Sequence, residues 1–255
     1  MRDADVRRRN AGRWRMPARS VNLMVNLFGR NKKPGLDSKT PITEVRYVAI
    51  DTELTGLDEN KDSIVSVGAM RMTGGRIDLG ATFYRLVSPR TELTAASVVI
   101  HEIMPSEVVA SPVIEPVLAE LLEFCGTDVL VGHFISIDLA FLNREMKRLR
   151  GHTLPNAVID TFSIYEWLRK RQKCRDFVST SVGGCRLSEI SECFGIPASG
   201  AHNALMDAFA TAQLFQRFLP LLIEAGAKDI GDLLKIGTPF KGGDRFRLSG
   251  EFSDF

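Results

Sequence analysis

Hydrophobic and polar positions at the start of the main body of the chain follow the pattern of β-strands. Residues 46–51 pass from alternation into a continuous apolar run that ends at an acid, as a buried strand does. Residues 63–72 are rich in Ile and Val and predict a second strand. A Gly-Gly pair at 74–75 predicts a tight turn into a third strand over 76–86. Three strands joined in this way predict an antiparallel meander.

The rest of the body has helical periodicity interrupted by short apolar segments. The spacing predicts strands over 128–132 and 157–160. It predicts helices over 105–124 (with a break near Ser111 and Pro112), 138–150, 161–171, 187–194 and 201–223, and one more helix over 229–236. Three strands, a helix, a strand, a helix, a strand and more helices predict an α/β fold, in which helices pack on a sheet.

The composition of the 255 residues is that of a globular protein, with 44% hydrophobic and 25% charged residues. It excludes a largely disordered chain, a collagen and a disulfide-stabilised miniprotein. A run of 18 apolar residues is missing, so a membrane-spanning helix is not expected and we predict a cytoplasmic protein. The cysteines form no CxxC pair, which favours reduced thiols over a zinc site on Cys174, Cys185 and Cys193.

Charge is distributed unevenly along the chain. Residues 1–33 contain ten Lys or Arg and two Asp, a net charge of +8, whereas the remainder has 23 basic and 29 acidic residues, a net charge of −6. An acidic body suits a site in which carboxylates hold metal cations. A basic arm suits nucleic acid, an anionic membrane surface or an acidic partner.

The arm also contains an amphipathic pattern, because the apolar residues Val21, Met24, Val25 and Phe28 recur at helical spacing. A solvated extension, docking onto a protein, and a membrane-surface or transit role remain open for it. Proline and glycine after this pattern indicate a linker. We therefore divide the chain into a basic N-terminal arm and linker (1–43), a catalytic domain (44–225) and a C-terminal extension (226–255).

Three acidic clusters fall at the ends of strands or the beginnings of helices. Asp51 and Glu53 are two residues apart in an extended strand, so both carboxylates point to the same side. Asp138 follows the fourth strand and opens a helix. His202 and Asp207 lie near the start of the long last helix.

Each cluster also has an ordinary structural interpretation. Acids are tolerated at exposed strand ends, and Asp138 can serve as a helix cap. A separation of five residues places His202 and Asp207 about 140° apart on a regular helix, so they converge only if His202 lies on the loop before it. His133, after the fourth strand, is predicted to be structural.

Taken together, four carboxylates and a histidine favour hydrolysis of phosphodiesters by two metal ions. Carboxylates are ligands for Mg²⁺ or Mn²⁺. Two such ions about 4 Å apart bind the attacking water and the leaving oxygen, and a histidine takes the proton of the water. P-loop, GxSxG, HExxH and GxGxxG motifs are missing from the sequence, which disfavours kinases, serine hydrolases and zinc proteases.

The same residues carry a resemblance to a known family. The motifs are Asp51-Thr-Glu-Leu-Thr-Gly-Leu57, Asp138 within GHFISIDLAFL, and His202-x₄-Asp207. In this order they resemble the three exonuclease motifs of the DEDDh (DnaQ-like) 3′–5′ exonucleases, such as the exonuclease domain of DNA polymerase III epsilon subunits. The match extends from about Tyr47 to Leu222.

The resemblance implies a fold and catalytic roles. The fold is ribonuclease H-like, with a five-stranded mixed sheet whose first three strands are antiparallel. Asp51, Glu53, Asp138 and Asp207 would ligate two Mg²⁺ or Mn²⁺ ions, with Asp51 bridging both. His202 would be the general base, and the product would be a nucleoside 5′-monophosphate.

The resemblance also implies substrate contacts. The residues expected to border the terminal nucleotide are Thr52, Leu54, Thr55, Gly56, Leu57, His101 and Phe134, with Leu57 wedged against the last base. The sequence departs from the family where Phe134 replaces an Asn, which exchanges a polar contact for base stacking and leaves the substrate preference open. Asp160 is expected to cap the helix over 161–171.

We therefore predict a metal-dependent 3′–5′ exonuclease acting on single-stranded DNA in proofreading or repair. The alternatives are an exoribonuclease on short RNA and a polymerase-associated binding module with weak nuclease activity. The expected partners are nucleic acid and, through the arm, a DNA polymerase or another protein.

Overall fold

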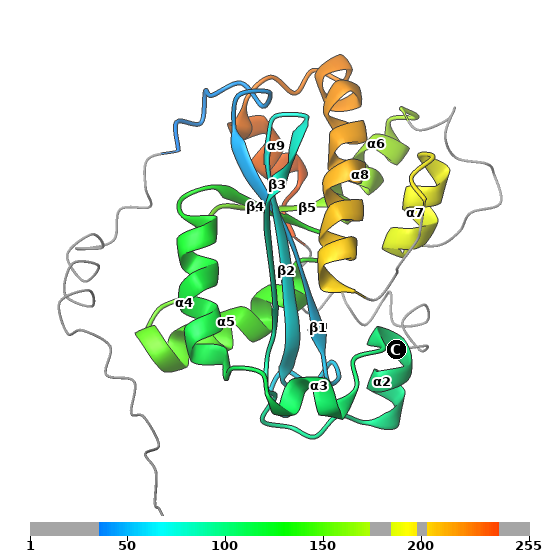
Figure 1. The fold of residues 1–255 in the computed structure, drawn as a ribbon. Helices are drawn as coiled ribbons and strands as arrows, with labels where there is room; N and C mark the ends of the chain where they lie inside the picture. Colours follow the sequence, from blue (N-terminus) through cyan, green and yellow to red (C-terminus); the bar gives the residue numbers. More distant parts are fainter. Residues whose placement is uncertain (1–35, 174–184, 198–202, 240–255) are drawn as a thin grey trace, which may run out of the picture. The chain divides into compact units, whose positions relative to one another are not determined.

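The described part of the chain is built on one mixed sheet. A computed structural model describes residues 36–173, 185–197 and 203–239. The strand order is β3-β2-β1-β4-β5 (Figure 1). The strands are β1 (Arg46–Leu54), β2 (Ile64–Thr73), β3 (Arg76–Leu86), β4 (Val129–Gly132) and β5 (Val158–Asp160). The first three pair antiparallel, as predicted, whereas β4 pairs parallel with β1 and β5 parallel with β4, which makes the sheet mixed.

Eight helices are present in the described residues. They are α2 (Ala95–His101), α3 (Pro105–Val109), α4 (Ile114–Cys125), α5 (Ser136–Arg150), α6 (Thr161–Lys170), α7 (Leu187–Cys193), α8 (Ala204–Glu224) and α9 (Ile230–Ile236). Figure 1 shows α4 and α5 on one side of the sheet and α6 and α8 on the other. The short helices α2 and α3 lie beyond the end at which β1 finishes.

Two hydrophobic cores explain this layering. Alternate residues of β1 enter different cores, because successive side chains of a strand point to opposite faces. Tyr47 and Ala49 pack with α6 and α8, whereas Val48 and Ile50 pack with α4 and α5. All four side chains are fully buried. By the same alternation, Asp51 lies on the α8 face.

The hairpin between β2 and β3 depends on a glycine. Gly74 has φ +50°, and a Cβ at this position would lie 2.2 Å from the carbonyl oxygen of Thr43. A side chain is therefore excluded both by the left-handed backbone and by the neighbouring chain. This confirms the tight turn that the Gly-Gly pair predicts.

The observed helices and strands differ from the predicted ones at several boundaries. Helix α8 begins at Ala204, three residues later than predicted. The helix α2 was not predicted; it begins with a capping box between Thr94 and Ser97. Helix α5 begins at Ser136, two residues early, and β1 continues to Leu54 because β2 pairs with it that far. The predicted break at Ser111 and Pro112 is present between α3 and α4.

The segment after residue 225 contributes to the same fold. Ile230 and Leu233 of α9 are fully buried in the core that α6 and α8 share. Asp229 caps α9 by accepting from the backbone N–H of Asp232 at 3.0 Å. The first part of the predicted C-terminal extension is thus continuous with the catalytic body. None of the helices in the described ranges has the length and apolar character needed to cross a bilayer.

The predicted helix in the arm, and the whole of residues 1–35, lie outside the described residues. Cys174 does as well, whereas Cys125, Cys185 and Cys193 are described and form no disulfide with one another. The proposed role of the arm and the domain boundaries therefore stay predictions.

Candidate active site

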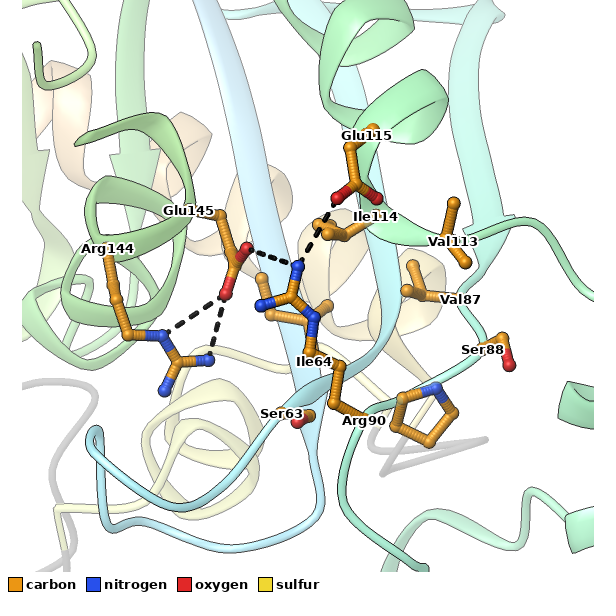
Figure 2. Close-up of a pocket in the computed structure, with 11 residues that line it drawn as sticks. Ser63, Ile64, Val87, Ser88, Arg90, Val113, Ile114, Glu115, Arg144 and Glu145 are labelled. Carbon is orange, nitrogen blue, oxygen red and sulfur yellow. Dashed lines mark hydrogen bonds and ion pairs between the residues drawn. The ribbon is translucent and has the colours of Figure 1, made fainter. Parts of the chain in front are cut away.

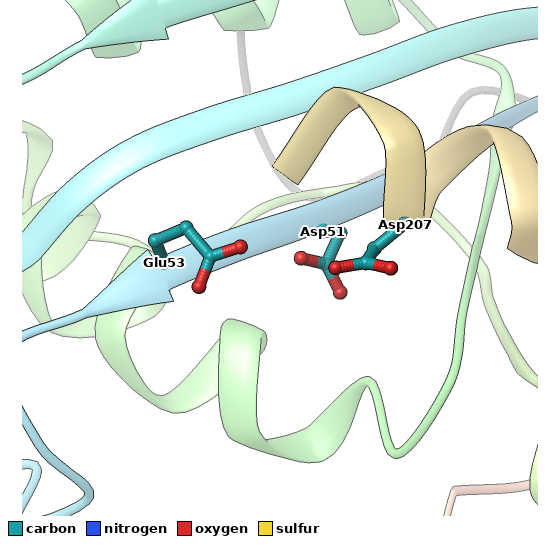
Figure 3. A group of neighbouring side chains, drawn as sticks. All are labelled: Asp51, Glu53 and Asp207. Carbon is teal, nitrogen blue, oxygen red and sulfur yellow. The ribbon is translucent and has the colours of Figure 1, made fainter. Parts of the chain in front are cut away.

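Three carboxylates meet where β1 ends and α8 begins. Asp51, Glu53 and Asp207 each offer an oxygen such that the three oxygens lie within 4.8 Å of one another. Figure 3 shows Asp51 and Glu53 projecting from β1 toward the same side, with Asp207 reaching down from α8 beside Asp51. The i, i+2 spacing on a strand aligns the first two, and packing of α8 on β1 supplies the third.

Helix α8 approaches the sheet closely at a glycine. Gly68 of β2 pairs with Asp51. A Cβ on Gly68 would lie 2.2–2.3 Å from backbone atoms of Ala204 and Leu205, closer than atoms can approach. A residue with a side chain would therefore push the first turn of α8 off the sheet, away from Asp51.

The start of α8 is fixed by its cap. The side chain of Asn203 accepts from the backbone N–H groups of Leu205 and Met206 at 3.1 and 3.3 Å. Its carbonyl accepts from the N–H of Asp207 at 2.9 Å. The cap defines where the helix begins, which places Asp207 in the first turn, next to the sheet.

The carboxylates are brought together at an electrostatic cost. Burial, and then the charges of Asp138, Glu53 and Asp207, raise the pKa of Asp51 well above its usual range. Burial, and then the charges of Asp207 and Asp138, raise the pKa of Glu53 to about 8. The Oε1 of Glu53 is buried and has no hydrogen-bond partner among the described residues. An orphaned oxygen in a crowd of like charges fits a hard divalent cation.

Asp138 joins the site from α5. It is 5% exposed, lies in the first turn of the helix, and accepts a hydrogen bond from the hydroxyl of Thr52 at 2.6 Å. Burial raises its pKa to about 7, and the bond from Thr52 opposes this rise. It is not one of the three carboxylates within 4.8 Å, but its charge acts on both Asp51 and Glu53.

An ion network holds α5 in place. The buried Glu145 contacts Arg144 at 3.2 Å, Arg148 at 2.8 Å and Arg90 at 3.8 Å. Arg90 and Arg148 also reach Glu115 of α4, at 3.3 and 2.7 Å. Figure 2 shows Glu145 between Arg144 and Arg90 in a pocket with apolar walls. The network ties the helix that carries Asp138 to α4 and to the segment after β3.

The loop after β1 presents an exposed leucine. The hydroxyl of Thr55 donates to Asp62 and accepts from the N–H of Ser63, both at 3.0 Å, which closes the loop. A Cβ at Gly56 would lie 2.6 Å from the carboxylate of Asp62, so the tight closure favours glycine. Leu57 follows and is 48% exposed. This exposed apolar side chain lies three residues beyond the end of β1, the strand that carries Asp51 and Glu53.

Two predicted contact residues of the first motif have side chains engaged within the protein. Thr52 is bonded to Asp138. Leu54 packs against the core that the sheet shares with α4 and α5. The alternation of β1 explains this, because Thr52 and Leu54 share the face opposite to that of Asp51 and Glu53.

His101 and Phe134 also have defined places in the fold. His101 ends α2, is 4% exposed, and accepts from the N–H of Ile103 at 3.1 Å through Nδ1. Phe134 has φ +51°, a conformation that asparagine adopts more readily than phenylalanine. Its ring packs on Phe162 with 4.4 Å between centroids and meets the edge of His133 at 4.8 Å.

His133 and Asp160 have the structural positions predicted for them. Nε2 of His133 donates to the carbonyl of Cys185 at 2.8 Å, and Nδ1 lies 2.9 Å from the hydroxyl of Thr161. Burial lowers the pKa of His133 to about 4, which keeps it neutral. Asp160 caps α6 by accepting from the N–H and hydroxyl of Ser163 at 3.1 and 2.8 Å.

Comparison with known proteins identifies the family. The model of the RNase_T family, described as exonuclease, matches residues 48–215. The chain belongs to this exonuclease family. The family predicted from the three motifs is thereby confirmed, and so is the predicted class of enzyme, an exonuclease.

Named relatives support this assignment. The exonuclease is 32% identical over 190 residues to DNA polymerase III subunit epsilon of Aquifex aeolicus. This match covers 74% of the chain and 88% of the relative. The chain is 33% identical over 219 residues to a DNA polymerase III subunit epsilon-like protein of Rhodobacter capsulatus. That match covers 85% of the chain and 29% of the relative, so the chain spans less than a third of the Rhodobacter protein.

A solved structure shares the fold. The E. coli exonuclease I in a zinc-bound complex with single-stranded DNA superposes with a TM-score of 0.60. The sequences are 17% identical, and the match covers 71% of this chain and 42% of the other. The ribonuclease H-like arrangement predicted for the exonuclease is confirmed.

One predicted catalytic residue is not visible in this geometry. His202 lies outside the described residues, directly before the cap residue Asn203. Helix α8 begins at Ala204, two residues after it. The role of His202 in the exonuclease stays a prediction.

Two residues that shape the site were not singled out from the sequence. Gly68 carries the signal of a glycine within an apolar strand, which indicates a close backbone approach. Asn203 carries the signal of an N-cap residue directly before a helical pattern. Both position the helix of Asp207 in the exonuclease rather than contributing a ligand.

Proposed function

We propose that the protein is a metal-dependent 3′–5′ exonuclease, which releases nucleoside 5′-monophosphates from single-stranded DNA in proofreading or repair. The observation that carries the proposal is the convergence of Asp51, Glu53 and Asp207 within 4.8 Å, next to the buried Asp138. The names of the relatives in DNA polymerase III support DNA as the substrate.

Asp51, Glu53, Asp138 and Asp207 are the residues that would hold two Mg²⁺ or Mn²⁺ ions. When bound, such ions neutralise the charge of the phosphodiester and of the departing oxygen and lower the pKa of water. The orphaned Oε1 of Glu53 and the raised pKa values of Asp51 and Glu53 support this donor set. The protein holds Asp51 and Glu53 on one strand, so their separation is fixed before substrate arrives.

His202 is the proposed general base. An imidazole with a pKa near neutrality can take a proton from the attacking water near neutral pH. Bound cations would keep the carboxylates ionised at the same pH. His133 is unsuited to this task, because both of its ring nitrogens are engaged and its burial holds the pKa at about 4.

The substrate end is proposed to lie against the loop after β1. Leu57 would contact the last base, with Thr55 and Gly56 shaping the loop and His101 and Phe134 bordering the nucleotide. The exposure of Leu57 and the half-buried ring of Phe134 support this placement. The side chains of Thr52 and Leu54 lie on the other face of β1, so these residues would influence the substrate through the position of this strand and not by direct side-chain contact.

The partner proposed for the basic arm is a DNA polymerase. It is supported by the charge of residues 1–33 and by the printed names of the relatives. Replacing Arg7, Arg8 and Arg9 by Ala should weaken co-elution with the polymerase of the same organism while sparing hydrolysis of short oligonucleotides. If these changes instead weaken the binding of long DNA and make the affinity for DNA depend less on salt concentration, the arm binds nucleic acid directly.

The deciding experiment follows degradation of single-stranded DNA and RNA labelled at either end, with Mg²⁺ or Mn²⁺. A 3′–5′ exonuclease shortens the 5′-labelled strand stepwise and releases a labelled mononucleotide from the 3′-labelled strand at once. Asp51→Asn and Asp207→Asn should abolish both patterns. The matched control is Asp78→Asn, which alters an exposed aspartate on β3.

The outcomes separate the alternatives. Trimming of RNA in preference to DNA would replace the DNA proposal with an exoribonuclease. Absence of trimming with either metal would contradict the catalytic proposal and favour a binding module.

A further inference from the structure

Thr52 occupies an unusual place between two of the acids. It follows Asp51 and precedes Glu53 in β1, yet its side chain lies on the opposite face of the strand. It is 8% exposed and donates its hydroxyl hydrogen to Oδ1 of Asp138 at 2.6 Å. The bond joins residues 86 positions apart in the sequence and connects β1 to the first turn of α5.

The geometry is that of a strong bond to a charged acceptor. Hydrogen bonds from a hydroxyl to an ionised carboxylate are about 2.5–2.7 Å long, shorter than those between neutral groups. Asp138 is itself 5% exposed, so water has little access to compete for the same oxygen. The hydroxyl therefore restrains the torsion angle of the Asp138 carboxylate, together with the backbone N–H groups of Asp138 and Thr52, which also hydrogen-bond to it.

We propose that Thr52 is a positioning residue, whose hydroxyl engages Oδ1 of Asp138 so that Oδ2 is offered to a divalent cation. The inference rests on the proposed function, in which Asp138 is a cation ligand. Thr52 then couples the ligand on α5 to the two ligands on β1, because one strand carries Asp51, Glu53 and the group that orients Asp138. Bonds to the ligand of a metal typically change metal affinity 10–100-fold when removed.

A purely structural role is the competing explanation. The bond also links α5 to the sheet, so its loss could loosen the helix without any effect on a cation. Such a role predicts lower stability in EDTA with Mn²⁺ affinity unchanged. A positioning role predicts a loss of Mn²⁺ affinity in protein that is still folded.

The test compares Thr52→Val, which keeps the shape and removes the hydroxyl, with Thr52→Ser, which restores the hydroxyl. Mn²⁺ binding is measured by the electron paramagnetic resonance signal of free Mn²⁺, and folding by circular dichroism. We expect Thr52→Val to lose Mn²⁺ affinity about tenfold or more and Thr52→Ser to stay within about threefold of the unmodified protein. In hydrolysis assays, kcat should fall for Thr52→Val with KM for DNA little changed, because the proposed role of Thr52 acts through Asp138 and its side chain lies on the face of β1 opposite to Asp51.

A double-mutant cycle with Asp138→Asn identifies the path of the effect. If the hydroxyl acts through Asp138, Thr52→Val should cause no further loss of Mn²⁺ affinity in the Asp138→Asn protein. Should Thr52→Val fail to fold, Thr52→Cys replaces it, because a thiol is of similar size and a weak donor. Unchanged Mn²⁺ affinity in the folded hydroxyl-free variant, or an equal loss in Thr52→Ser, would overturn the inference.

The Mn²⁺ measurement keeps this inference separate from the proposed function. A protein that binds Mn²⁺ in a Thr52-dependent way but hydrolyses neither DNA nor RNA would contradict the nuclease proposal alone. A protein that hydrolyses DNA with Mn²⁺ affinity independent of Thr52 would contradict the positioning role alone.

Discussion

Gly68 faces Asp51 across the antiparallel pair of β1 and β2, and the backbone of α8 fills the space that a side chain on Gly68 would need. The distance between Asp51 and Asp207 thus depends on a residue that carries no functional group. A strand glycine usually weakens a sheet, because it loses more conformational freedom on folding than other residues. Here the missing side chain lets the helix bearing Asp207 approach the strand bearing Asp51.

Gly68→Ala should therefore damage both folding and activity. The added Cβ would lie 2.2 Å from the carbonyl carbon of Ala204, and backbone cannot move aside as a flexible side chain does. We expect a loss of roughly 3 kcal/mol in the free energy of unfolding, at the upper end for overpacked sites. Urea denaturation measures this, and Mn²⁺ binding to the folded fraction should weaken because Asp207 is displaced.

The matched control for this change is Gly80→Ala. Gly80 also lies in a strand, but an added Cβ would meet only Oδ1 of Asp78, at 3.5 Å, an ordinary contact. Its free energy of unfolding should change by less than about 1 kcal/mol. Equal effects of the two substitutions would show that strand propensity, and not the approach of α8, explains the loss at Gly68.

Much of the site could be predicted from local sequence patterns. Asp51 and Glu53 share a face because of the two-residue period of a strand, which needs no knowledge of the tertiary structure. The fold class also followed from the order of predicted strands and helices. Asp160 was predicted to cap α6 from its position before a helical pattern, and it does so.

The remainder depends on distances between elements far apart in the chain. The bond from Thr52 to Asp138 requires α5 to begin beside β1, which periodicity does not specify. The left-handed φ of Phe134 follows from the path between β4 and α5, and its ring is held by Phe162. Helix α2 was not predicted because it has only seven residues, and three of them, Ala95, Ala96 and Val99, are apolar but exposed, which gives a weak periodic pattern.

Glu145→Gln tests the ion network that holds α5. The carboxylate is 6% exposed at its side chain and serves three arginines, so neutralising it leaves their charges short of a partner. We expect a loss of roughly 1.5–3 kcal/mol in the free energy of unfolding, the usual range for hydrogen bonds to charged groups. Urea denaturation at low and high salt measures the change.

The control for the network is Glu120→Gln. Glu120 pairs with Arg85 at 2.8 Å, but both side chains are about half exposed, at 50% and 48%. Exposed pairs contribute little, so this substitution should alter the free energy of unfolding by less than about 0.5 kcal/mol. A loss for Glu145→Gln no larger than that of the control would contradict a clamping role for the buried carboxylate.

The raised pKa values predict how stability without metal depends on pH. The pKa of Glu53 is raised to about 8 and that of Asp138 to about 7, from ordinary values near 4 in the unfolded chain. Between about pH 4 and the raised pKa values, the folded protein therefore binds more protons than the unfolded chain. Its free energy of unfolding falls as the pH rises through about 7 and 8, where Asp138 and Glu53 lose their protons. His133 acts oppositely, but only below pH 6.5, because its pKa is lowered to about 4.

Thermal unfolding between pH 6.5 and 8 measures this dependence. In EDTA the melting temperature should decrease over the window. With saturating Mg²⁺ the decrease should vanish or reverse, because cations compete with protons for the same carboxylates and bind better as they ionise. Glu53→Gln should flatten the decrease in EDTA, and a melting temperature that rises with pH in EDTA would refute the assignment.

Leu57→Ala tests the contact proposed for the last base. Leu57 is 48% exposed, so the free energy of unfolding should change by less than about 0.5 kcal/mol. If the side chain is covered by a base during the reaction, its loss should lower kcat/KM for single-stranded DNA about tenfold, equivalent to about 1.4 kcal/mol of apolar contact. Leu79→Ala, on β3 toward the hairpin and 70% exposed, is the control and should leave kcat/KM unchanged. Equal kcat/KM values for Leu57→Ala and Leu79→Ala would place the terminal base elsewhere. If shortening Leu57 does not lower kcat/KM, its side chain is not covered by substrate during the reaction.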